Sequence, residues 1–402
     1  MFFHKKSRKK TYRNHMKKIV IALDSFKGCL TTDEAGKAAA EGVQAACPEC
    51  ETIVLPVADG GEGMLDVLVS ATDGAYRMIR AHDPLMVSRN ARYGISGDGR
   101  TAFIEMAAIS GLPLVSADQR NPMLTTTYGT GELIVDALER GCRNFIIGLG
   151  GSATNDAGLG MLQALGYRFL NKAGEATGCI DKKQVLCGAL MADVASVDVS
   201  RVHPALQEAR FTAACDVQNP FCGQNGAAFV FAPQKGADQE MVLRLDSAMQ
   251  QLAQVIRNHT GKDISLYPGA GAAGGMGGSL FAFLNAELKP GIQLVLDTLH
   301  FSEKIKEADL ILTGEGKSDR QTLMGKVPFG ILEEARKQKI PVMLLSGSIE
   351  DVHELNKAGF QGVFSITPSP LSLEDAMKPT IAKANIKRAT EQVCRMISGN
   401  TQ

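Results

Sequence analysis

The sequence contains no tryptophan, few aromatic residues and no excess of either charge. Of its 402 residues only 5% are aromatic, and 43 Lys and Arg balance 43 Asp and Glu. A net charge of zero gives no indication of nucleic-acid binding or of attraction to a membrane surface. No apolar run is long enough to cross a bilayer. We therefore expect a cytoplasmic protein that binds neither nucleic acid nor membrane.

Several catalytic signatures are also missing. The sequence has no GxSxG and no HExxH, and none of its seven histidines lies in a glycine-rich loop, which disfavours a serine hydrolase or a zinc protease. The nine cysteines are scattered, and the pair Cys47 and Cys50 has no second pair beside it. We therefore expect reduced thiols rather than a zinc site.

Glycine, in contrast, is abundant, with 42 residues, and the composition is typical of an α/β enzyme of two or three domains. The most informative stretch is GLGGSATNDAGLG, residues 148–160. It follows an apolar run typical of a buried strand and precedes a helical pattern. Its glycines allow a sharp turn that approaches a ligand closely.

This turn is interpreted as a ligand-binding element. The polar residues 152–156 are expected at a helix N-terminus, which offers unpaired N–H groups and a partial positive charge suited to phosphate or carboxylate. An ordinary turn with helix caps is the alternative. The residues assigned to ligand binding here are Gly150, Gly151, Ser152, Thr154 and Asn155.

Charged loops follow two predicted strands in the N-terminal part of the chain. Strand 19–23 leads into DSFKG (24–28), and a helix is expected after Thr31, whose spacing from Glu34 matches a capping box. Strand 53–57 leads into an acidic, glycine-rich loop before a helix that begins at Met64. Both loops are candidates for metal, proton or phosphate chemistry, although a surface ion pair would also explain the first.

The same pattern recurs near the C-terminus. Predicted strands at 309–312, 342–345 and 363–366 run into polar loops, with helices expected at 327–338, 352–358 and 373–397. Strands that alternate with helices indicate a parallel sheet covered on both faces. Because ligands bind beyond the carboxyl ends of such strands, we expect the charged loops to converge on one crevice.

The middle of the chain has strands and helices of its own. Strands are predicted at 101–106, 144–148, 211–215 and 228–231, and helices at 132–140, 159–165 and 237–259. The prediction is therefore an α/β protein of two domains. A Rossmann-like parallel sheet of residues 16–79 and 284–402 is interrupted by an inserted α/β domain of residues 80–283. The cleft between them would hold the substrates.

Two partial nucleotide motifs are weak on their own. Residues 269–274 match GxGxxG, but Pro268 precedes them and 264–267 makes a poor strand. A loop near a nucleotide, or an interdomain hinge, is favoured over a dinucleotide site. Gly316-Lys317-Ser318 is similar to the end of a P-loop, but Ile311 occupies the position of its first glycine. Lys317 is therefore treated as a separate phosphate-binding or structural cation.

Residues 1–15 differ from the rest of the chain. Six of them are Lys or Arg, and no apolar core of a secretory signal follows. We expect either a disordered basic leader or translation that starts at Met16.

Seven stretches resemble, in order, the glycerate kinase family common in bacteria. They are KIVIALDSFKG (18–28), VADGGEGM (57–64), GLGGSATNDAGLGM (148–161), CDVQNPFCG (215–223), FAPQKGA (231–237), GAGAAGGMGG (269–278) and ADLILTGEGKSDRQTLMGKVP (308–328). Leu23, Ser318 and Arg320 depart from the residues usual in the family, which leaves fine substrate preference open. The resemblance implies ATP-dependent phosphorylation of D-glycerate, most often at the 2-hydroxyl, by two α/β domains.

Phosphoryl transfer requires a held triphosphate, a metal and a positioned hydroxyl, and the loops supply candidates for each. Catalytic roles are assigned to Lys27, Asp59, Asp156, Asp216 and Glu315. Beyond the turn at 148–156, the predicted substrate or nucleotide ligands are Ser25, Gly271, Gly274, Lys317 and Gln321. Mg²⁺ is predicted at Asp24 and Asp319. The expected partners are D-glycerate and ATP, and association into a homo-oligomer is left open.

Two alternatives belong to other classes of protein. An NAD-dependent hydroxy-acid oxidoreductase would use GAGAAG for its dinucleotide, and bound NAD would favour it. A non-catalytic sensor of small acids would bind glycerate without consuming ATP.

Overall fold

The computed structural model describes residues 16–61, 63–178 and 185–398, so the predicted leader of residues 1–15 lies outside the described residues. The chain divides into two compact units. One combines the chain up to Val57 with the chain from His300 onward, and we call it the outer unit. The other, Ala58–Leu299, is called the inserted unit. These boundaries differ from the predicted ones because α2 (Met64–Ala71) and α9 (Gly291–Thr298) pack on each other and on strands of the inserted unit.

The outer unit is built on a five-stranded sheet in the order β13-β12-β11-β1-β2, and all neighbouring strands are parallel. Its strands are β1 (Lys18–Leu23), β2 (Glu51–Val54), β11 (Leu310–Ser318), β12 (Val342–Ile349) and β13 (Gly362–Ser365). The pairing of β1 with β11 joins the two segments of chain that form this unit. The buried sides of β1 and β11 carry Ile and Leu, as a sheet covered on both faces requires.

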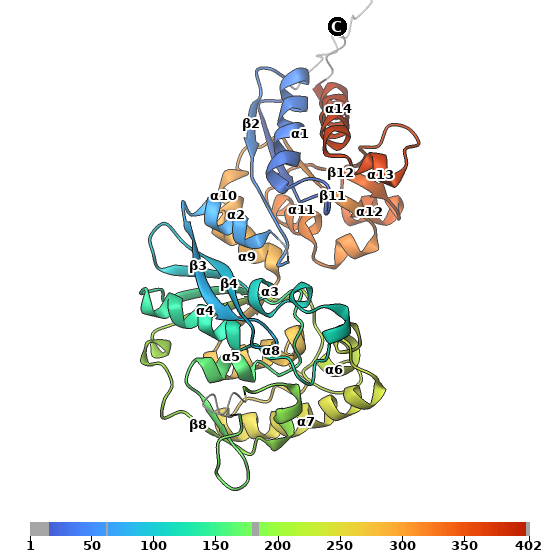
Figure 1. The fold of residues 1–402 in the computed structure, drawn as a ribbon. Helices are drawn as coiled ribbons and strands as arrows, with labels where there is room; N and C mark the ends of the chain where they lie inside the picture. The colour runs from blue at the N-terminus through green and yellow to red at the C-terminus, as the bar shows by residue number, and fades with distance from the viewer. Residues whose placement is uncertain (1–15, 62, 179–184, 399–402) are drawn as a thin grey trace, which may run out of the picture. The chain divides into compact units, whose positions relative to one another are not determined.

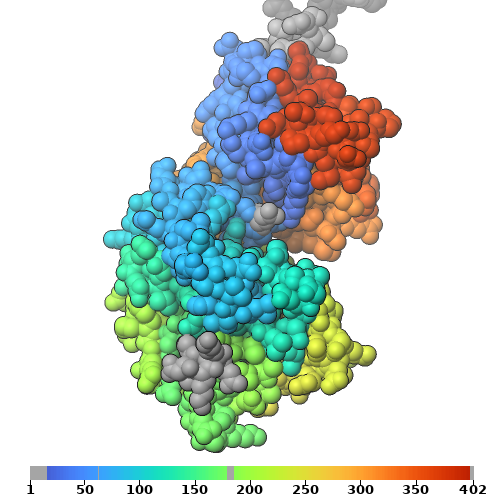
Figure 2. Space-filling view, viewed as in Figure 1, coloured from blue at the N-terminus to red at the C-terminus, as the bar shows by residue number. Residues whose placement is uncertain are grey.

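Helices α1 (Thr32–Ala46) and α14 (Pro379–Ser398) lie side by side in the outer unit, blue and red in Figure 1. Their contact depends on small residues, because a Cβ added at Gly42 would lie 2.3 Å from the carbonyl oxygen of Lys387. The space-filling view shows these N-terminal and C-terminal segments as one continuous body (Figure 2). The remaining helices are α10 (Phe301–Lys304), η7 (Arg320–Met324), α11 (Val327–Lys337), α12 (Val352–Ala358) and α13 (Leu373–Ala376).

The inserted unit contains a six-stranded mixed sheet in the order β10-β9-β6-β5-β4-β3. Strands β10, β9, β6 and β5 are parallel, whereas β4 and β3 form an antiparallel hairpin at one edge. The bounds are β3 (Ala75–His82), β4 (Ser88–Ile95), β5 (Thr101–Glu105), β6 (Asn144–Gly148), β9 (Arg210–Ala214) and β10 (Glu287–Lys289). A separate two-stranded sheet pairs β7 (Arg168–Leu170) with β8 (Ser196–Asp198).

Helices and one large apolar cluster complete the inserted unit. The α-helices are α3 (Ala107–Ser110), α4 (Tyr128–Glu139), α5 (Leu159–Ala164), α6 (Ala227–Phe231), α7 (Gln239–Thr260) and α8 (Ala272–Leu284), in addition to α2 and α9. Short 3-10 helices are η1 (Leu112–Leu114), η2 (Ala117–Gln119), η4 (Gly188–Asp193), η5 (Pro204–Gln207) and η6 (Pro233–Lys235). Across the described ranges, no helix is both long enough and apolar enough to span a membrane.

The predicted fold class, a parallel α/β sheet interrupted by a second α/β region, is confirmed, but some elements differ. Residues 228–231 were predicted as a strand and belong to helix α6, because a short apolar run does not distinguish the two by periodicity. The polar loop expected after residue 312 is strand, since β11 and β12 remain paired as far as Ser318 and Ile349. The helix predicted over 373–397 is interrupted, and Pro379 begins its second part.

Candidate active site

In the outer unit, predicted site residues meet where β1 ends beside β11. Leu23 pairs with Gly314, and the Asp24 N–H donates to the Gly314 carbonyl oxygen at 2.9 Å. The buried Asp24 carboxylate accepts the Ser25 N–H at 2.7 Å. A Cβ added at Gly316 would lie 3.8 Å from the backbone nitrogen of Lys27, so the DSFKG loop passes next to β11. The structure therefore brings Asp24, Ser25 and the exposed Lys27 close to the segment that carries Glu315.

Glu315 is buried and held by hydroxyl groups. Its carboxylate accepts Ser318 Oγ at 3.0 Å and Thr322 Oγ1 at 2.6 Å, and Lys326 Nζ lies 3.5 Å from its second oxygen. Burial raises the pKa of Glu315, while Thr322 and Lys326 oppose part of that rise. The prediction overlooked Lys326, although it stands in the family-like stretch just before α11.

Lys317, Asp319 and Gln321 already have partners within the outer unit. Lys317 Nζ lies 2.9 Å from a Glu350 carboxylate oxygen and 3.8 Å from Asp319. The Asp319 carboxylate accepts the Gln321 N–H at 2.8 Å as the N-cap of η7. These contacts give each residue a local structural role, and their predicted roles toward ligands stay predictions.

The inserted unit presents a second group of residues at the carboxyl ends of its parallel strands. Glu105, Gly148, Ala214 and Lys289 are the last residues of β5, β6, β9 and β10, and they lie in neighbouring strands. Asp216 follows β9, and its carboxylate accepts the Gly291 N–H at 2.8 Å. This is the sheet edge at which α/β proteins bind their ligands.

Glycine allows the acidic loop 58–61 to cross this edge. A Cβ at Gly60 would lie 2.8 Å from Asp216 Oδ2, and a Cβ at Gly291 would lie only 2.1 Å from the Gly60 Cα. Such close approach of two backbones excludes any side chain. Half-buried Asp59, which accepts the Gly61 N–H at 2.9 Å, is thereby brought next to Asp216.

The environment of Asp216 alters its acidity. Partial removal of water raises the pKa of Asp216 although the residue keeps an exposed edge, and the negative charge of Asp59 raises it further. The N–H groups of Gly291 and Gly60 oppose these effects. A pair of neighbouring carboxylates at a ligand-binding edge can bind a cation or accept a proton.

The glycine turn lies beside this acidic loop. A Cβ at Gly150 would lie 3.6 Å from the Gly61 Cα, and Gly150 and Gly151 are both exposed. The expectation that residues 152–156 begin a helix is wrong. Ser152 instead forms an isolated β-bridge with Gly111, and α5 begins only at Leu159, after Gly158 with φ +73°. Thr154, Asn155 and Asp156 are fully buried instead of lining a helix N-terminus.

Asp156 is held entirely by the protein. Its carboxylate accepts the backbone N–H and the hydroxyl of Thr127, both at 2.8 Å, and the N–H groups of Gly158 and Gly160 at 3.1 and 3.2 Å. Burial raises its pKa and these hydrogen bonds oppose the rise. The arrangement ties residues 127 and 156–160 together, and it does not favour Asp156 as the base that receives a substrate proton.

The GxGxxG-like glycines are also explained by packing. A Cβ added at Gly271 would lie 2.2 Å from the Pro220 carbonyl oxygen. One added at Gly274 would lie 2.1 Å from the Thr154 carbonyl oxygen. Gly274 has φ +67°, and its carbonyl oxygen accepts the Ala157 N–H at 3.0 Å. Residues 264–267 form no strand, so the dinucleotide motif lacks its context. These contacts do not support direct nucleotide binding by either glycine.

One buried cation was missed altogether. Lys235, at the end of η6, donates to Ser152 Oγ at 2.8 Å and to the Thr154 carbonyl oxygen at 2.6 Å. Its stretch FAPQKGA contributes to the family resemblance, but lysine is almost always exposed, so nothing in the sequence marked it as buried.

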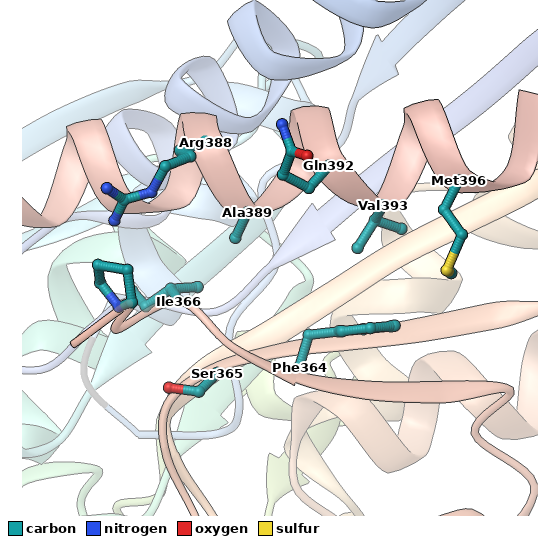
Figure 3. A pocket seen from close by; sticks show the side chains of 9 residues that line it. Phe364, Ser365, Ile366, Arg388, Ala389, Gln392, Val393 and Met396 are labelled. Carbon is teal, nitrogen blue, oxygen red and sulfur yellow. The ribbon is translucent and has the colours of Figure 1, made fainter. Parts of the chain in front are cut away.

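An apolar groove of about 380 Å³ lies elsewhere in the outer unit, between α14 and the end of β13. Figure 3 shows Val393 and Met396 of α14 facing Phe364, with Arg388 toward the opposite end of the groove. The described residues that line it include none of the predicted site residues.

Carboxylates and glycine turns at the carboxyl ends of parallel strands are the arrangement of an α/β enzyme with a phosphorylated ligand. The model of the glycerate kinase family matches residues 19–398, and the chain belongs to this family. It is 46% identical to a Bacillus cereus protein named glycerate kinase, covering 94% of this chain and 97% of that one.

Two further similarities agree with this result. The chain is 44% identical to a protein of Escherichia coli K12 named glycerate 2-kinase, over 95% of this chain and 98% of the other. A crystal structure of a Salmonella typhimurium LT2 protein, named for glycerate kinase 2, superposes with a TM-score of 0.85 at 42% identity. That similarity covers 96% of this chain and 99% of the other.

Proposed function

We propose that this chain phosphorylates D-glycerate with ATP and that the product is 2-phosphoglycerate. The family match and the 44% identity to a protein named glycerate 2-kinase support the reaction and the choice of hydroxyl. The structural observation that carries the proposal is the glycine-mediated approach of Asp59 to Asp216 beside the exposed turn at Gly150 and Gly151.

In the inserted unit, Asp59 and Asp216 are the proposed reactive carboxylates. A carboxylate whose pKa lies above its ordinary value accepts a proton more readily near neutral pH, so Asp216 is the proposed acceptor of the glycerate hydroxyl proton. Gly150 and Gly151 are exposed residues, and their backbone N–H groups are proposed to bind an anionic group of either substrate, because a glycine backbone approaches a ligand without side-chain hindrance.

In the outer unit, the exposed Lys27 supplies a cation for phosphate, with Ser25 beside it. Buried Glu315 and half-buried Lys326 form a pair next to this loop, where Lys326 offers a second positive charge. Lys317, Asp319 and Gln321 are kept as weaker candidates because each already has a partner.

Carboxylates of the predicted site also suit Mg²⁺, which prefers carboxylate oxygens and retains several waters. Asp24 in the outer unit and Asp59 in the inserted unit are separate candidates to hold such an ion, and Asp216 stays the proposed proton acceptor. Asp319 suits it less, since its carboxylate caps η7 and lies 3.8 Å from Lys317. When bound, Mg²⁺ neutralises charge on the transferred phosphoryl group.

A coupled assay of ADP formation with D-glycerate tests the proposal, and NMR of the product identifies the phosphorylated hydroxyl. We expect ATP consumption that depends on D-glycerate and Mg²⁺, with phosphate on the 2-oxygen. Product phosphorylated at the 3-oxygen would overturn the regiochemistry alone. Binding of glycerate with no ATP consumption would overturn the reaction and favour the sensor.

A further inference from the structure

The ammonium group of Lys235 is in an unusual environment. The residue is 2% exposed, and its two hydrogen-bond partners are a hydroxyl and a carbonyl oxygen rather than a carboxylate. Among the described residues, no carboxylate oxygen lies within the 4.0 Å ion-pair distance of its Nζ. Burying a lysine without an ion pair costs free energy. Such costly buried charges are concentrated at functional sites.

Both partners of Lys235 belong to the segment that follows the exposed glycine turn. Ser152 and Thr154 come directly after Gly150 and Gly151 in the chain, and Gly150 lies next to Gly61 of the acidic loop. The lysine therefore acts on the side of this segment that faces away from solvent, close to the proposed reacting groups of the inserted unit.

Other contacts fix the same segment from different directions. The Leu112 N–H donates to the Gly151 oxygen at 2.8 Å, and the Ala153 N–H donates to the Ser110 oxygen at 2.9 Å. Gly274 packs against the Thr154 carbonyl. Two further polar atoms here, Thr154 Oγ1 and Asn155 Oδ1, are buried without a hydrogen-bond partner. The Thr125 hydroxyl also donates to the Ala153 oxygen at 3.0 Å, and the ammonium adds the side-chain hydrogen bonds to Ser152 and Thr154 on either side of it.

We propose that Lys235 is a positioning residue for phosphoryl transfer, whose ammonium fixes Ser152 and Thr154 and thereby holds the Gly150–Gly151 turn against the Asp59 loop. This inference rests on the proposed function, because the turn and the loop are its proposed substrate-binding and reactive elements. Lys235 itself does not touch substrate.

The charge on Lys235 changes with pH near neutrality. Burial lowers the pKa of Lys235 to about 7, and the negative charge of Asp156 opposes the decrease. Arg120 also approaches this element through its backbone at Gly236, while its guanidinium donates to the Val115 oxygen. A charged donor forms the stronger hydrogen bonds. The contribution of Lys235 to activity should therefore be present below about pH 7 and decrease as the pH rises through its pKa.

The test compares K235M with S152A and with K172M, in which an exposed lysine after β7 is replaced as a matched control. We expect K235M to lower kcat/KM at least tenfold, chiefly through kcat, and to remove the ionisation near neutral pH from the rate profile. S152A should show a smaller loss, and the double variant should be no worse than K235M because the two groups act together. K172M should keep wild-type kinetics.

Hydrogen exchange gives a second measurement that does not depend on activity. The amides of residues 150–154 should exchange faster in K235M than in wild type and be unchanged in K172M. If K235M does not fold, Lys235→Gln and S152A replace it, and their kinetics and hydrogen exchange are compared with those of wild type and K172M.

The inference is overturned if the wild type phosphorylates glycerate while K235M and S152A keep its kcat/KM and its pH profile. Unchanged exchange at residues 150–154 in the folded lysine variant would also overturn it. Absence of activity in the wild type would overturn the proposed function instead, and the exchange experiment would still decide whether the lysine holds the turn.

Discussion

The outer and inserted units hold their candidate carboxylates by different means. In the outer unit, Glu315 is held by the side chains of Ser318, Thr322 and Lys326. In the inserted unit, Asp216 and Asp156 are held largely by backbone N–H groups, most of them from glycine.

This difference affects which substitutions each unit tolerates. Side-chain donors can be exchanged or replaced by water, whereas a backbone donor is available only if the chain comes close enough. In the inserted unit that closeness depends on glycines whose added Cβ would overlap another backbone, as at Gly291 and Gly274. We therefore expect the chemistry of the inserted unit to be sensitive to one added methyl group, and that of the outer unit to depend on charge and hydroxyl pattern.

The largest expected effect is on activity, at the acidic pair. Asp216→Asn keeps the shape of the side chain but removes the negative charge proposed to accept the hydroxyl proton, and we expect kcat to fall by about a hundredfold to ten-thousandfold. Steady-state ATP consumption with D-glycerate measures the change. The exposed Asp118, in η2, provides the control D118N, which should behave as wild type. Equal activity of D216N and D118N would contradict the proposed role.

Asp156 should instead affect stability. Asp156→Ala leaves two N–H groups of glycine and both donors of Thr127 buried without their acceptor. Loss of such a buried network costs about 3–5 kcal/mol of unfolding free energy. Urea denaturation measures it, with D118A as the control. A variant that unfolds like wild type but has lost its activity would restore Asp156 as a catalytic residue.

Substitution of two glycines with similar backbone angles distinguishes the contribution of close packing to stability from that of backbone strain. A Cβ added at Gly274 (φ +67°) would lie 2.1 Å from the Thr154 carbonyl oxygen. A Cβ added at Gly174 (φ +78°) would have no atom within 4 Å. Gly174→Ala should cost about 1 kcal/mol for the left-handed backbone alone. Gly274→Ala should cost about 1–3 kcal/mol more because a backbone must move. Equal shifts in thermal unfolding would show that packing at Gly274 is not critical.

The smallest effect concerns Glu315 and pH. Burial raises its pKa in the folded chain, so between the ordinary and the raised value the folded protein binds more protons than the unfolded chain. Wild-type stability therefore falls as pH rises through that interval, a dependence that Glu315→Gln lacks. The unfolding free energy of E315Q minus that of wild type should increase as the pH rises above the ordinary pKa of a glutamate and through the raised pKa of Glu315. A constant difference would contradict the role of burial.

Local sequence signals predicted much of the fold correctly. The capping box at Thr31 and Glu34 is present, and β6 has the predicted bounds because an apolar run before several glycines allows few alternatives. The DSFKG loop does follow β1, as predicted, but the charged residues Glu315 and Lys317 lie within β11. The elements that were predicted wrongly depend on contacts between distant parts of the chain. The extension of β11 to Ser318 depends on its pairing with β12, and helix α6 depends on packing that a five-residue apolar run does not encode.

The predicted site was limited in the same way. The positions of Asp24 and Asp216 just after strands were predicted correctly, and their roles toward ligands stay predictions. The burial of Lys235 could not be predicted, because it results from contacts with residues some 80 positions away. Asp156 and Gly274 looked like ligand-binding residues because glycine-rich polar stretches are typical of such sites, yet the structure uses them to pack one loop against another.

The pairing of β1 with β11 has a consequence for synthesis on the ribosome. The inserted unit is one continuous segment and can fold as soon as it has emerged, but β1 and β2 must wait for a neighbour that is translated almost 300 residues later. Until then the side of β1 that will receive β11 is an open strand edge, the kind of surface through which nascent chains associate with one another. A transcript truncated before residue 310 should therefore yield a folded central segment attached to an aggregation-prone N-terminal arm.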